Sequence, residues 1–307
     1  NITVSQAGNA NYNPASTFRT LVVDKANQVI NFGTLSDKTF GDASFALTAT
    51  GGNSGNPVTY TSSNTSVAWI SGSTVNIIGA GTTNITASQA GNVNYNPATS
   101  VIQPLLVNKA NQTITFNPLP NKNFGNSPFT LNATSSSNLS VSYTSSNTSV
   151  ATISGNTVTI VGAGTTNITA SQAGNGNYNP ATSVIQPLLV EKANQTITFN
   201  SLPNKTFGDA PFALSATGGV SGNPVTFSSS NTSVATISGN TVTIVGAGAT
   251  NITASQVGNG NYNPASDVIQ SLVVNKASQT ITFNPLPNKV FGDTPFALSA
   301  TGGASGN

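Results

Sequence analysis

The sequence predicts an all-β protein of tandem β-sandwich modules with about seven strands each. Three observations lead to this prediction: short segments alternate polar and apolar residues, turn residues separate them, and the pattern recurs every ~83 to 84 residues. The tyrosine of an Asn-Tyr-Asn-Pro-Ala segment marks the period at Tyr12, Tyr95, Tyr178 and Tyr262. We expect complete modules at 25–108, 109–191 and 192–275, the C-terminal part of a module at 1–24 and the N-terminal part of another at 276–307.

The module at 109–191 illustrates the expected strands in order. Residues 113–116 read Thr-Ile-Thr-Phe, and 129–133 alternate in the same way, as half-buried strands do. Further strands are expected at 141–143, 150–153, 157–160, 166–170 and 183–190. No segment keeps a period of 3.6 residues, so no helix is expected. The predicted core residues are Ile114, Phe116, Phe129, Leu131, Val141, Tyr143, Val158, Ile160 and Ile168.

Turn residues explain how these strands connect. Gly155-Asn156 predicts a tight hairpin in which both residues take positive φ values. The connection from the last strand of one module to the first strand of the next, 188–197, lacks Gly and Pro, so it is not a flexible linker. We therefore expect limited bending between modules and an extended rod that rises by roughly 35–45 Å per module. Because the sequence starts and stops part-way through the period, we also expect it to be a window on a longer polymer.

Composition excludes several classes of function. Only 5% of the residues are charged, the net charge is +2, and the lysines are spread singly, so no nucleic-acid site is expected. No apolar run approaches the ~20 residues of a membrane helix. The absence of cysteine and histidine removes thiolate chemistry, the usual general base and the commonest metal ligand. We expect no catalysis, no metal and no cofactor.

Two motifs give the repeat a family resemblance. The run 145–153, Ser-Ser-Asn-Thr-Ser-Val-Ala-Thr-Ile, is followed at 162–170 by Gly-Ala-Gly-Thr-Thr-Asn-Ile-Thr-Ala. Together they resemble the bacterial immunoglobulin-like (Big) repeat family, and 172–181 is similar to tandem Ig-like modules of very large bacterial surface proteins. The resemblance implies an Ig-like sandwich, an extracellular or cell-surface location and a stalk role. It implies no catalytic residue.

The tyrosine segments are the first candidate site. An exposed Tyr12, Tyr95, Tyr178 or Tyr262 could stack on a sugar ring while the neighbouring asparagines bind its hydroxyl groups, which would make the segment a glycan-binding loop. The preferred interpretation is structural: Tyr178 closes the end of its sandwich and Asn179-Pro180 shapes the turn.

The few acidic residues form the second candidate. Asp42, Asp209 and Asp293 follow a Phe-Gly pair, where they could assist a Lys–Asn crosslink, but the second repeat carries Asn126 there. We therefore interpret this position as turn-forming. A calcium site between modules would need several convergent carboxylates, which the junctions lack.

The last strand of each module is apolar on both faces. Pro104 and Pro187 would each remove a ladder donor, which favours an edge strand. We expect the outward residues Ile102, Leu106, Ile185 and Leu189 to form lateral contacts in a fibre. The alternative is that the junction and the next module cover Ile185 and Leu189.

Taken together, these features predict a structural, non-catalytic extracellular segment that acts as a filament or surface stalk. Its expected partners are further copies of the same repeat, in the chain and laterally in a fibre. The alternative is an adhesin array that binds glycans or other cells through the Tyr12, Tyr95, Tyr178 and Tyr262 loops.

Overall fold

The structure, a computed structural model, describes residues 1–306. Within this range every regular element is a β-strand and none is a helix, which confirms the all-β prediction. The chain divides into two compact units. Unit 1 comprises residues 1–117, 132–144 and 169–185, and unit 2 comprises residues 118–131, 145–168 and the chain from Gln186 onward. The module boundaries and the rise per module remain predictions.

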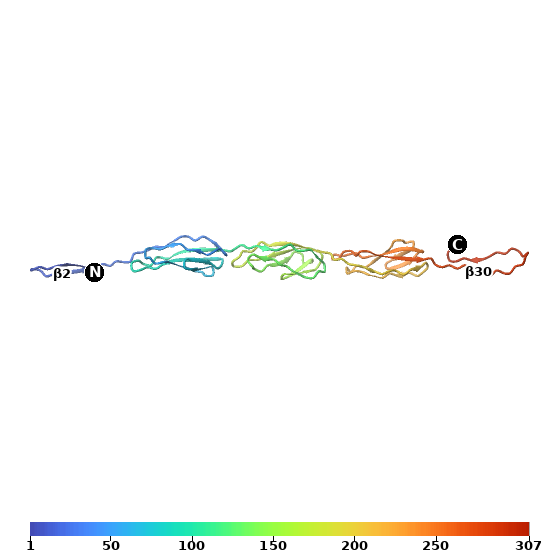
Figure 1. The fold of residues 1–307 in the computed structure, drawn as a ribbon, viewed down its shortest axis with the longest axis horizontal. Coiled ribbons are helices and arrows are strands. Elements are labelled where there is room, and N and C mark those ends of the chain that lie inside the picture. The colour runs from blue at the N-terminus through green and yellow to red at the C-terminus, as the bar shows by residue number, and fades with distance from the viewer. Residues whose placement is uncertain (307) are drawn as a thin grey trace. The chain divides into compact units, whose positions relative to one another are not determined.

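Unit 1 contains the β-sandwich of the repeat at 25–108. Its four-stranded sheet has the order β4-β11-β10-β7, its three-stranded sheet the order β5-β9-β8, and β3 pairs with β6. These pairings are antiparallel, except that β4 runs parallel to β11. Figure 1 draws them in blue to cyan as two facing layers. The strands are β3 (Asn31–Phe32), β4 (Lys38–Thr39), β5 (Phe45–Ala46), β6 (Ala49–Thr50), β7 (Val58–Ser62), β8 (Ala68–Ser71), β9 (Thr74–Ile77), β10 (Gly81–Gln89) and β11 (Val101–Asn108).

The core of this sandwich follows from the alternation along its two longest strands. In β10, Ile85 and Ala87 are buried between neighbours that are more exposed, and in β11 Leu105 and Val107 alternate with exposed residues. This period of two sends one side of each strand into the core. Phe32 and Tyr60 pack beside it, with ring centroids 5.7 Å apart. Each large apolar side chain buried here stabilises the fold by about 1.5–3 kcal/mol.

Unit 2 contains the same architecture in the repeat at 192–275. Its four-stranded sheet has the order β22-β29-β28-β25, its three-stranded sheet the order β23-β27-β26, and β21 pairs with β24. The core again centres on two long strands, with Ile252 and Leu272 fully buried. The strands are β21 (Thr198–Phe199), β22 (Lys205–Thr206), β23 (Phe212–Ala213), β24 (Ala216–Thr217), β25 (Thr226–Ser229), β26 (Ala235–Ser238), β27 (Thr241–Ile244), β28 (Gly248–Ser255) and β29 (Val268–Asn275).

The repeat at 109–191 contributes strands to both units. All nine predicted core residues, from Ile114 to Ile168, are buried or half-buried, as expected. Within unit 1, β12 pairs with β15, and within unit 2, β18 pairs with β14 and with β17. The strands are β12 (Ile114–Thr115), β13 (Lys122–Asn123), β14 (Phe129–Thr130), β15 (Thr134–Ser135), β16 (Ser142–Ser145), β17 (Ala151–Ser154), β18 (Thr157–Ile160), β19 (Gly164–Ser171) and β20 (Val184–Glu191).

The structure differs from the sequence prediction at three places. The strand expected at 129–133 ends at Thr130 and pairs with β18, and a separate strand at 134–135, outside the predicted range, pairs with β12 in another sheet. The strand β13 has no alternating pattern and was not predicted; it is held by parallel pairing with β20. In the hairpin, Gly155 has φ 61° but Asn156 is not in the positive region, as in a type II′ turn with glycine first.

The last strand of the repeat at 25–108 is only partly an edge strand. The order of the sheet places β11 between β10 and β4, but β4 pairs only with Val107 and Asn108. Pro104 therefore lies on the part of β11 that has β10 as its single partner. The edge prediction holds for that part and is wrong for the end of the strand, where Phe40 N–H also donates to Asn108 O (2.8 Å).

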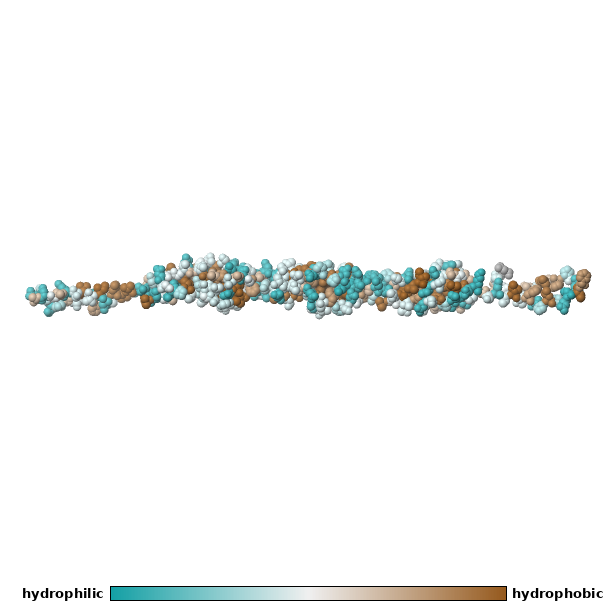
Figure 2. All heavy atoms as spheres, viewed as in Figure 1, coloured by the Kyte–Doolittle hydropathy of each residue, from teal (hydrophilic) through white to brown (hydrophobic). Residues whose placement is uncertain are grey.

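Each terminal segment forms one small antiparallel pair. Strand β1 (Ile2–Gln6) pairs with β2 (Ala15–Arg19), and β30 (Thr282–Phe283) pairs with β31 (Ala300–Thr301). All residues of these four strands are exposed. Figure 2 shows brown, hydrophobic side chains on the surface of both segments.

Candidate functional site

The Asn-Tyr loop is a compact turn organised by its first asparagine. We use this name for the segments 9–14, 92–97, 175–180 and 259–264. In the third loop, Asn175 Oδ1 accepts hydrogen bonds from the backbone N–H groups of Asn177 (2.8 Å) and Tyr178 (2.9 Å). Asn9, Asn92 and Asn259 form the same two bonds in the other loops. This side-chain turn is the local preference of asparagine, so each loop folds the same way.

A glycine just before the loop makes this turn possible. A Cβ placed on Gly174 would lie 2.4 Å from the carbonyl oxygen of Tyr178, and the φ of Gly174 is +76°. Gly8, Gly91 and Gly258 meet the corresponding tyrosine oxygen at 2.2 or 2.3 Å. No L side chain fits so close an approach, which accounts for a glycine at this place in every repeat.

The loop binds first to the beginning of its own repeat. In unit 1, Tyr178 forms a parallel β-bridge with Ala110, and Lys109 Nζ donates to Asn175 O (2.8 Å). The side chain of Gln112 donates through Nε2 to Asn179 O (2.7 Å). The Lys-Ala-x-Gln segment is therefore the part of the repeat that holds the loop.

The same loop also contacts the preceding repeat. The rings of Tyr178 and Phe40 lie 5.4 Å apart at 82°, an edge-to-face arrangement. Asn177 Oδ1 accepts a hydrogen bond from Ala80 N–H (2.9 Å). The absence of a side chain at Gly79 lets Asn177 Oδ1 come this close, because a Cβ on Gly79 would lie only 3.2 Å from this oxygen. One ring pair and one hydrogen bond thus connect two consecutive repeats within unit 1.

Unit 2 repeats this contact with equivalent residues. Tyr262 and Phe124 have ring centroids 5.4 Å apart at 86°, and Asn261 Oδ1 accepts from Ala163 N–H (2.8 Å). On its own repeat, the loop bridges Ala193 through Tyr262. Lys192 Nζ and Gln195 Nε2 donate to Asn259 O (2.7 Å) and Asn263 O (2.9 Å). The same geometry thus occurs at two pairs of consecutive repeats, which indicates that the contact is a regular feature of the repeat.

The predicted tyrosines differ in exposure. Tyr95, Tyr178 and Tyr262 are half-buried, whereas Tyr12 is 77% exposed. The ring of Tyr178 lies against the preceding repeat, a role that the sequence interpretation missed. The Phe-Gly pair and the Asn-Tyr loop recur with the same period, and this shared period was the signal in the sequence that could have revealed their contact. Glycan binding at Tyr12, Tyr95, Tyr178 and Tyr262 remains a prediction.

The acidic position after Phe-Gly forms a turn, as predicted. Asp42 Oδ2 accepts from Thr39 N–H (2.9 Å), and Asp209 and Asp293 do the same in their repeats. Asn126 accepts from Asn123 N–H at the same distance of 2.9 Å. Each turn also positions a lysine over a phenylalanine ring, for example Lys38 at 4.8 Å from Phe45.

The predicted lateral-contact residues are exposed. Ile102 and Ile185 are each 58% exposed, and Leu106 and Leu189 are each 38% exposed. The third repeat shows the same pair of values at Ile269 and Val273. The alternative, that neighbouring structure covers Ile185 and Leu189, is therefore wrong for the described chain. Whether these side chains form lateral contacts stays a prediction.

Two other kinds of feature are absent among the described residues. In residues 1–306 no three His, Cys, Asp or Glu side chains come together in a way that could hold a metal ion. The same residues contain no helix that is both long and apolar enough to span a membrane.

Comparisons with known proteins leave the family open. No protein-family model matches the sequence, and no curated protein matches it. Among solved structures, Drosophila N-cadherin EC1-4 is 12% identical, with 90% of this chain and 84% of that chain covered and a TM-score of 0.27. The human desmocollin-1 ectodomain is 8% identical, with 85% and 65% covered and a TM-score of 0.32. Domains 1-6 of the surface layer protein SbsC are 18% identical, with 88% and 43% covered and a TM-score of 0.24. At these values the likeness assigns no family, ligand or partner.

Proposed function

We propose that this chain is a structural, non-catalytic segment of an extracellular repeat protein that acts as a filament or surface stalk. One observation carries the proposal: the same ring pair and hydrogen bond connect consecutive repeats twice, through Phe40 and Tyr178 in unit 1 and Phe124 and Tyr262 in unit 2. A repeated contact between neighbours suits an array whose task is to transmit force or set a length.

The contact has the strength expected of a restraint on bending. An aromatic pair contributes about 0.5–1.5 kcal/mol beyond its buried area, and a hydrogen bond contributes about 0.5–1.5 kcal/mol. Each junction would thus resist opening by about 1–3 kcal/mol, which is several times thermal energy at the upper end. The connecting segments add to this, because they lack the Gly and Pro of a flexible linker.

The extracellular location in this proposal rests on the resemblance to bacterial Ig-like repeats. The outward apolar residues on β11, β20 and β29 support a filament in particular, because Ile102 and Ile185 would be buried by lateral association. The glycan-binding alternative requires tyrosine rings free to stack on a sugar, and two of the four rings are already in contact with a phenylalanine.

Electron microscopy of single chains tests the mechanical role. We expect the combined substitution Tyr178→Ala and Tyr262→Ala to broaden the distribution of angles between consecutive repeats. Tyr12→Ala is the matched control, since its ring is exposed and contacts no phenylalanine among residues 1–306. Equal angle distributions in the double variant and the control would contradict the proposed restraint. Images of the native assembly would then distinguish a fibre of several strands from a single stalk.

A further inference from the structure

Each complete repeat has an Asn-Thr-Ser segment in the connection between two strands, at 64–66, 147–149 and 231–233. We call this segment the Asn-Thr-Ser turn. Asparagine, then any residue except proline, then serine or threonine is the sequence at which a sugar is attached to the asparagine amide nitrogen. The same pattern also occurs elsewhere, for example at Asn84 and Asn111, so the sequence alone does not select a site.

The Asn-Thr-Ser turn is accessible from solvent. All three of its residues are exposed in each of the three repeats. Among residues 1–306, the Nδ2 atoms of Asn64, Asn147 and Asn231 donate no hydrogen bond. The nitrogen that would receive a sugar is therefore free of a competing partner.

The serine of the turn binds the oxygen of the same amide group. Asn64 Oδ1 accepts from Ser66 N–H (3.2 Å) and from the Ser66 hydroxyl (2.7 Å). In the other two repeats the corresponding distances are 3.1 Å and 2.6 Å. Two donors on Oδ1 stabilise the negative charge that this oxygen acquires when Nδ2 loses a proton, as the donors of an oxyanion hole do. The turn thus holds the amide in a geometry that favours nucleophilic attack by its nitrogen.

The other repeated occurrences of the pattern lack this combination. Asn84 and Asn251 lie within β10 and β28, each of which has a strand on either side in its four-stranded sheet. A transferase could not take such a strand into its active site without opening the sheet. At Asn111 and Asn194, Oδ1 accepts from an asparagine side chain of the Asn-Tyr loop, at 2.9 Å and 2.8 Å. The structure therefore singles out the Asn-Thr-Ser turn.

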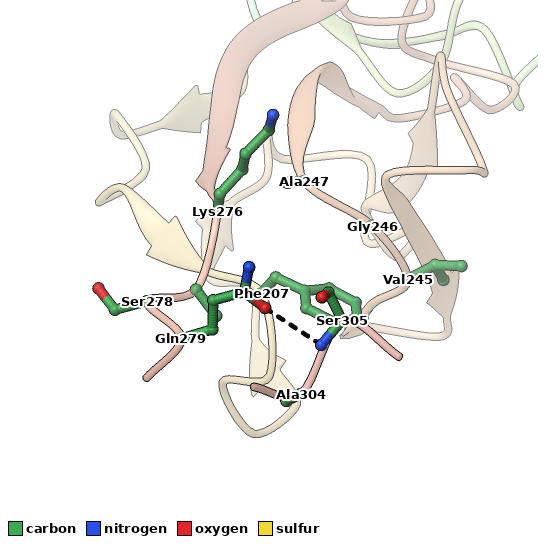
Figure 3. Close-up of a pocket in the computed structure, with 10 residues that line it drawn as sticks. Phe207, Val245, Gly246, Ala247, Lys276, Ser278, Gln279, Ala304 and Ser305 are labelled. Atoms are coloured by element: carbon green, nitrogen blue, oxygen red, sulfur yellow. Dashed lines mark hydrogen bonds between the residues drawn. The ribbon is translucent and has the colours of Figure 1, made fainter. Parts of the chain in front are cut away.

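The turn adjoins the contact between repeats. A Cβ on Gly79 would lie 2.7 Å from Ser66 O and 3.2 Å from Asn177 Oδ1, which belongs to the next Asn-Tyr loop. Gly246 has the same place in the third repeat, where a Cβ would lie 2.6 Å from Ser233 O. Figure 3 shows Gly246 on the wall of a cavity of about 580 Å³. A sugar on the turn would be carried at the same end of each repeat.

We propose that Asn64, Asn147 and Asn231 are acceptor sites for N-linked glycosylation. The donor is a sugar phosphate, linked to a nucleotide or to a lipid, that a glycosyltransferase supplies. The bond from Nδ2 to the anomeric carbon forms while the bond from that carbon to the phosphate oxygen breaks. The Nδ2 proton passes to a base of the transferase, and the phosphate group leaves with the bonding electron pair.

This proposal goes beyond the proposed function, because a stalk or filament requires no attached sugar. It would nevertheless change the surface of the protein. Sugars are bulky and strongly hydrated, so they would add solubility to a chain in which only 5% of the residues are charged.

Mass spectrometry of the protein isolated from its native source tests the proposal. We expect peptides that contain Asn64, Asn147 or Asn231 to carry a sugar mass on the asparagine, and peptides that contain Asn84 to carry none. Two reactions on the purified, unmodified chain then distinguish the donors. One uses UDP-glucose with an N-glycosyltransferase, and the other uses a lipid-linked oligosaccharide with an oligosaccharyltransferase.

Two variants test the role of the serine in whichever reaction modifies the chain. Ser66→Ala should lose the sugar at Asn64 and keep it at Asn147 and Asn231, which serve as internal references. Thr65→Ala is the matched control and should keep all three sugars, because the Thr65 side chain is exposed and forms no hydrogen bond among the described residues.

Three results would overturn the proposal. One is bare asparagine at all three positions in the native protein, whatever the two transferase reactions show. The second is attachment at Asn84 to the same extent as at Asn64, and the third is a sugar retained at Asn64 in Ser66→Ala. The angles between repeats are measured on the unmodified chain, so the mechanical function and the glycosylation can each fail without the other.

Discussion

Replacing Asn177 by alanine should speed hydrogen exchange at the Ala80 amide of the preceding repeat. It should leave exchange at Ala163, the equivalent amide of the next junction, unchanged. The side chain of Asn177 accepts one hydrogen bond, from Ala80 N–H at 2.9 Å, while its backbone bonds belong to the loop and to Ala110. The substitution therefore removes a single contact between repeats. A hydrogen bond of this kind contributes about 0.5–1.5 kcal/mol, so protection of the Ala80 amide should fall roughly 2- to 12-fold.

Amide hydrogen exchange measures this directly. The Ala163 amide is the internal reference, since it donates to Asn261 Oδ1 at 2.8 Å in the same chain and keeps its partner. Asn11→Ala is the matched variant, because the side chain of Asn11 accepts no such bond among the described residues. We expect faster exchange at Ala80 in Asn177→Ala alone.

Unchanged exchange at Ala80 would refute the reasoning, because the side-chain bond would then contribute nothing to the junction. Equally faster exchange at Ala80 and Ala163 would also refute the reasoning. The substitution would then have lowered the stability of the chain in general and not of one junction. Partial protection that survives the substitution would point to the ring pair of Phe40 and Tyr178 as the larger contribution.

Three further predictions follow from individual positions. Leu105→Ala should destabilise its sandwich by about 2–5 kcal/mol in denaturant unfolding because Leu105 is fully buried, whereas Ile102→Ala on the same strand, 58% exposed, should change stability by less than about 0.5 kcal/mol. Gly174→Ala should cost more than about 1 kcal/mol, since its Cβ would meet a carbonyl oxygen at 2.4 Å and its φ is +76°, while Gly176→Ala, with nothing within 4 Å, should be nearly neutral. Asp209→Asn should be tolerated within about 0.5 kcal/mol in thermal unfolding, because an asparagine forms the same 2.9 Å bond in the second repeat; a larger loss would mean that the charge matters.

Local patterning predicted the parts of the fold that local forces determine. The strands at 157–160 and 166–170 were found because apolar and polar residues alternate over the whole strand, and Val158 and Ile168 are fully buried. The turn at Asp42 was found because aspartate and asparagine bond to nearby backbone groups in any context.

Contacts between distant residues explain what the sequence did not reveal. Strand β4 is two residues long, and its parallel pairing with β11 joins positions far apart in the chain. The switch of sheet between 130 and 134 likewise depends on which strand is available as a partner. For the site, the repeat showed that Phe-Gly and Asn-Tyr recur, but only the structure shows that they meet across consecutive repeats.

The pairing of unlike motifs gives the repeat its directional character. Each complete repeat carries both halves of the contact, a loop that binds the repeat before it and a Phe-Gly pair that receives the repeat after it. Such a heterologous contact joins two different surfaces, so each repeat keeps one of its two surfaces for a further neighbour. Contacts of this kind generate a ring or an open array. Tandem repeats of this type are normally terminated by a unit whose outer face has changed. The loop and the Phe-Gly pair are nearly identical in every complete repeat here, so each such repeat can contact a neighbour on both sides, and a terminating unit would have to lose one of the two motifs.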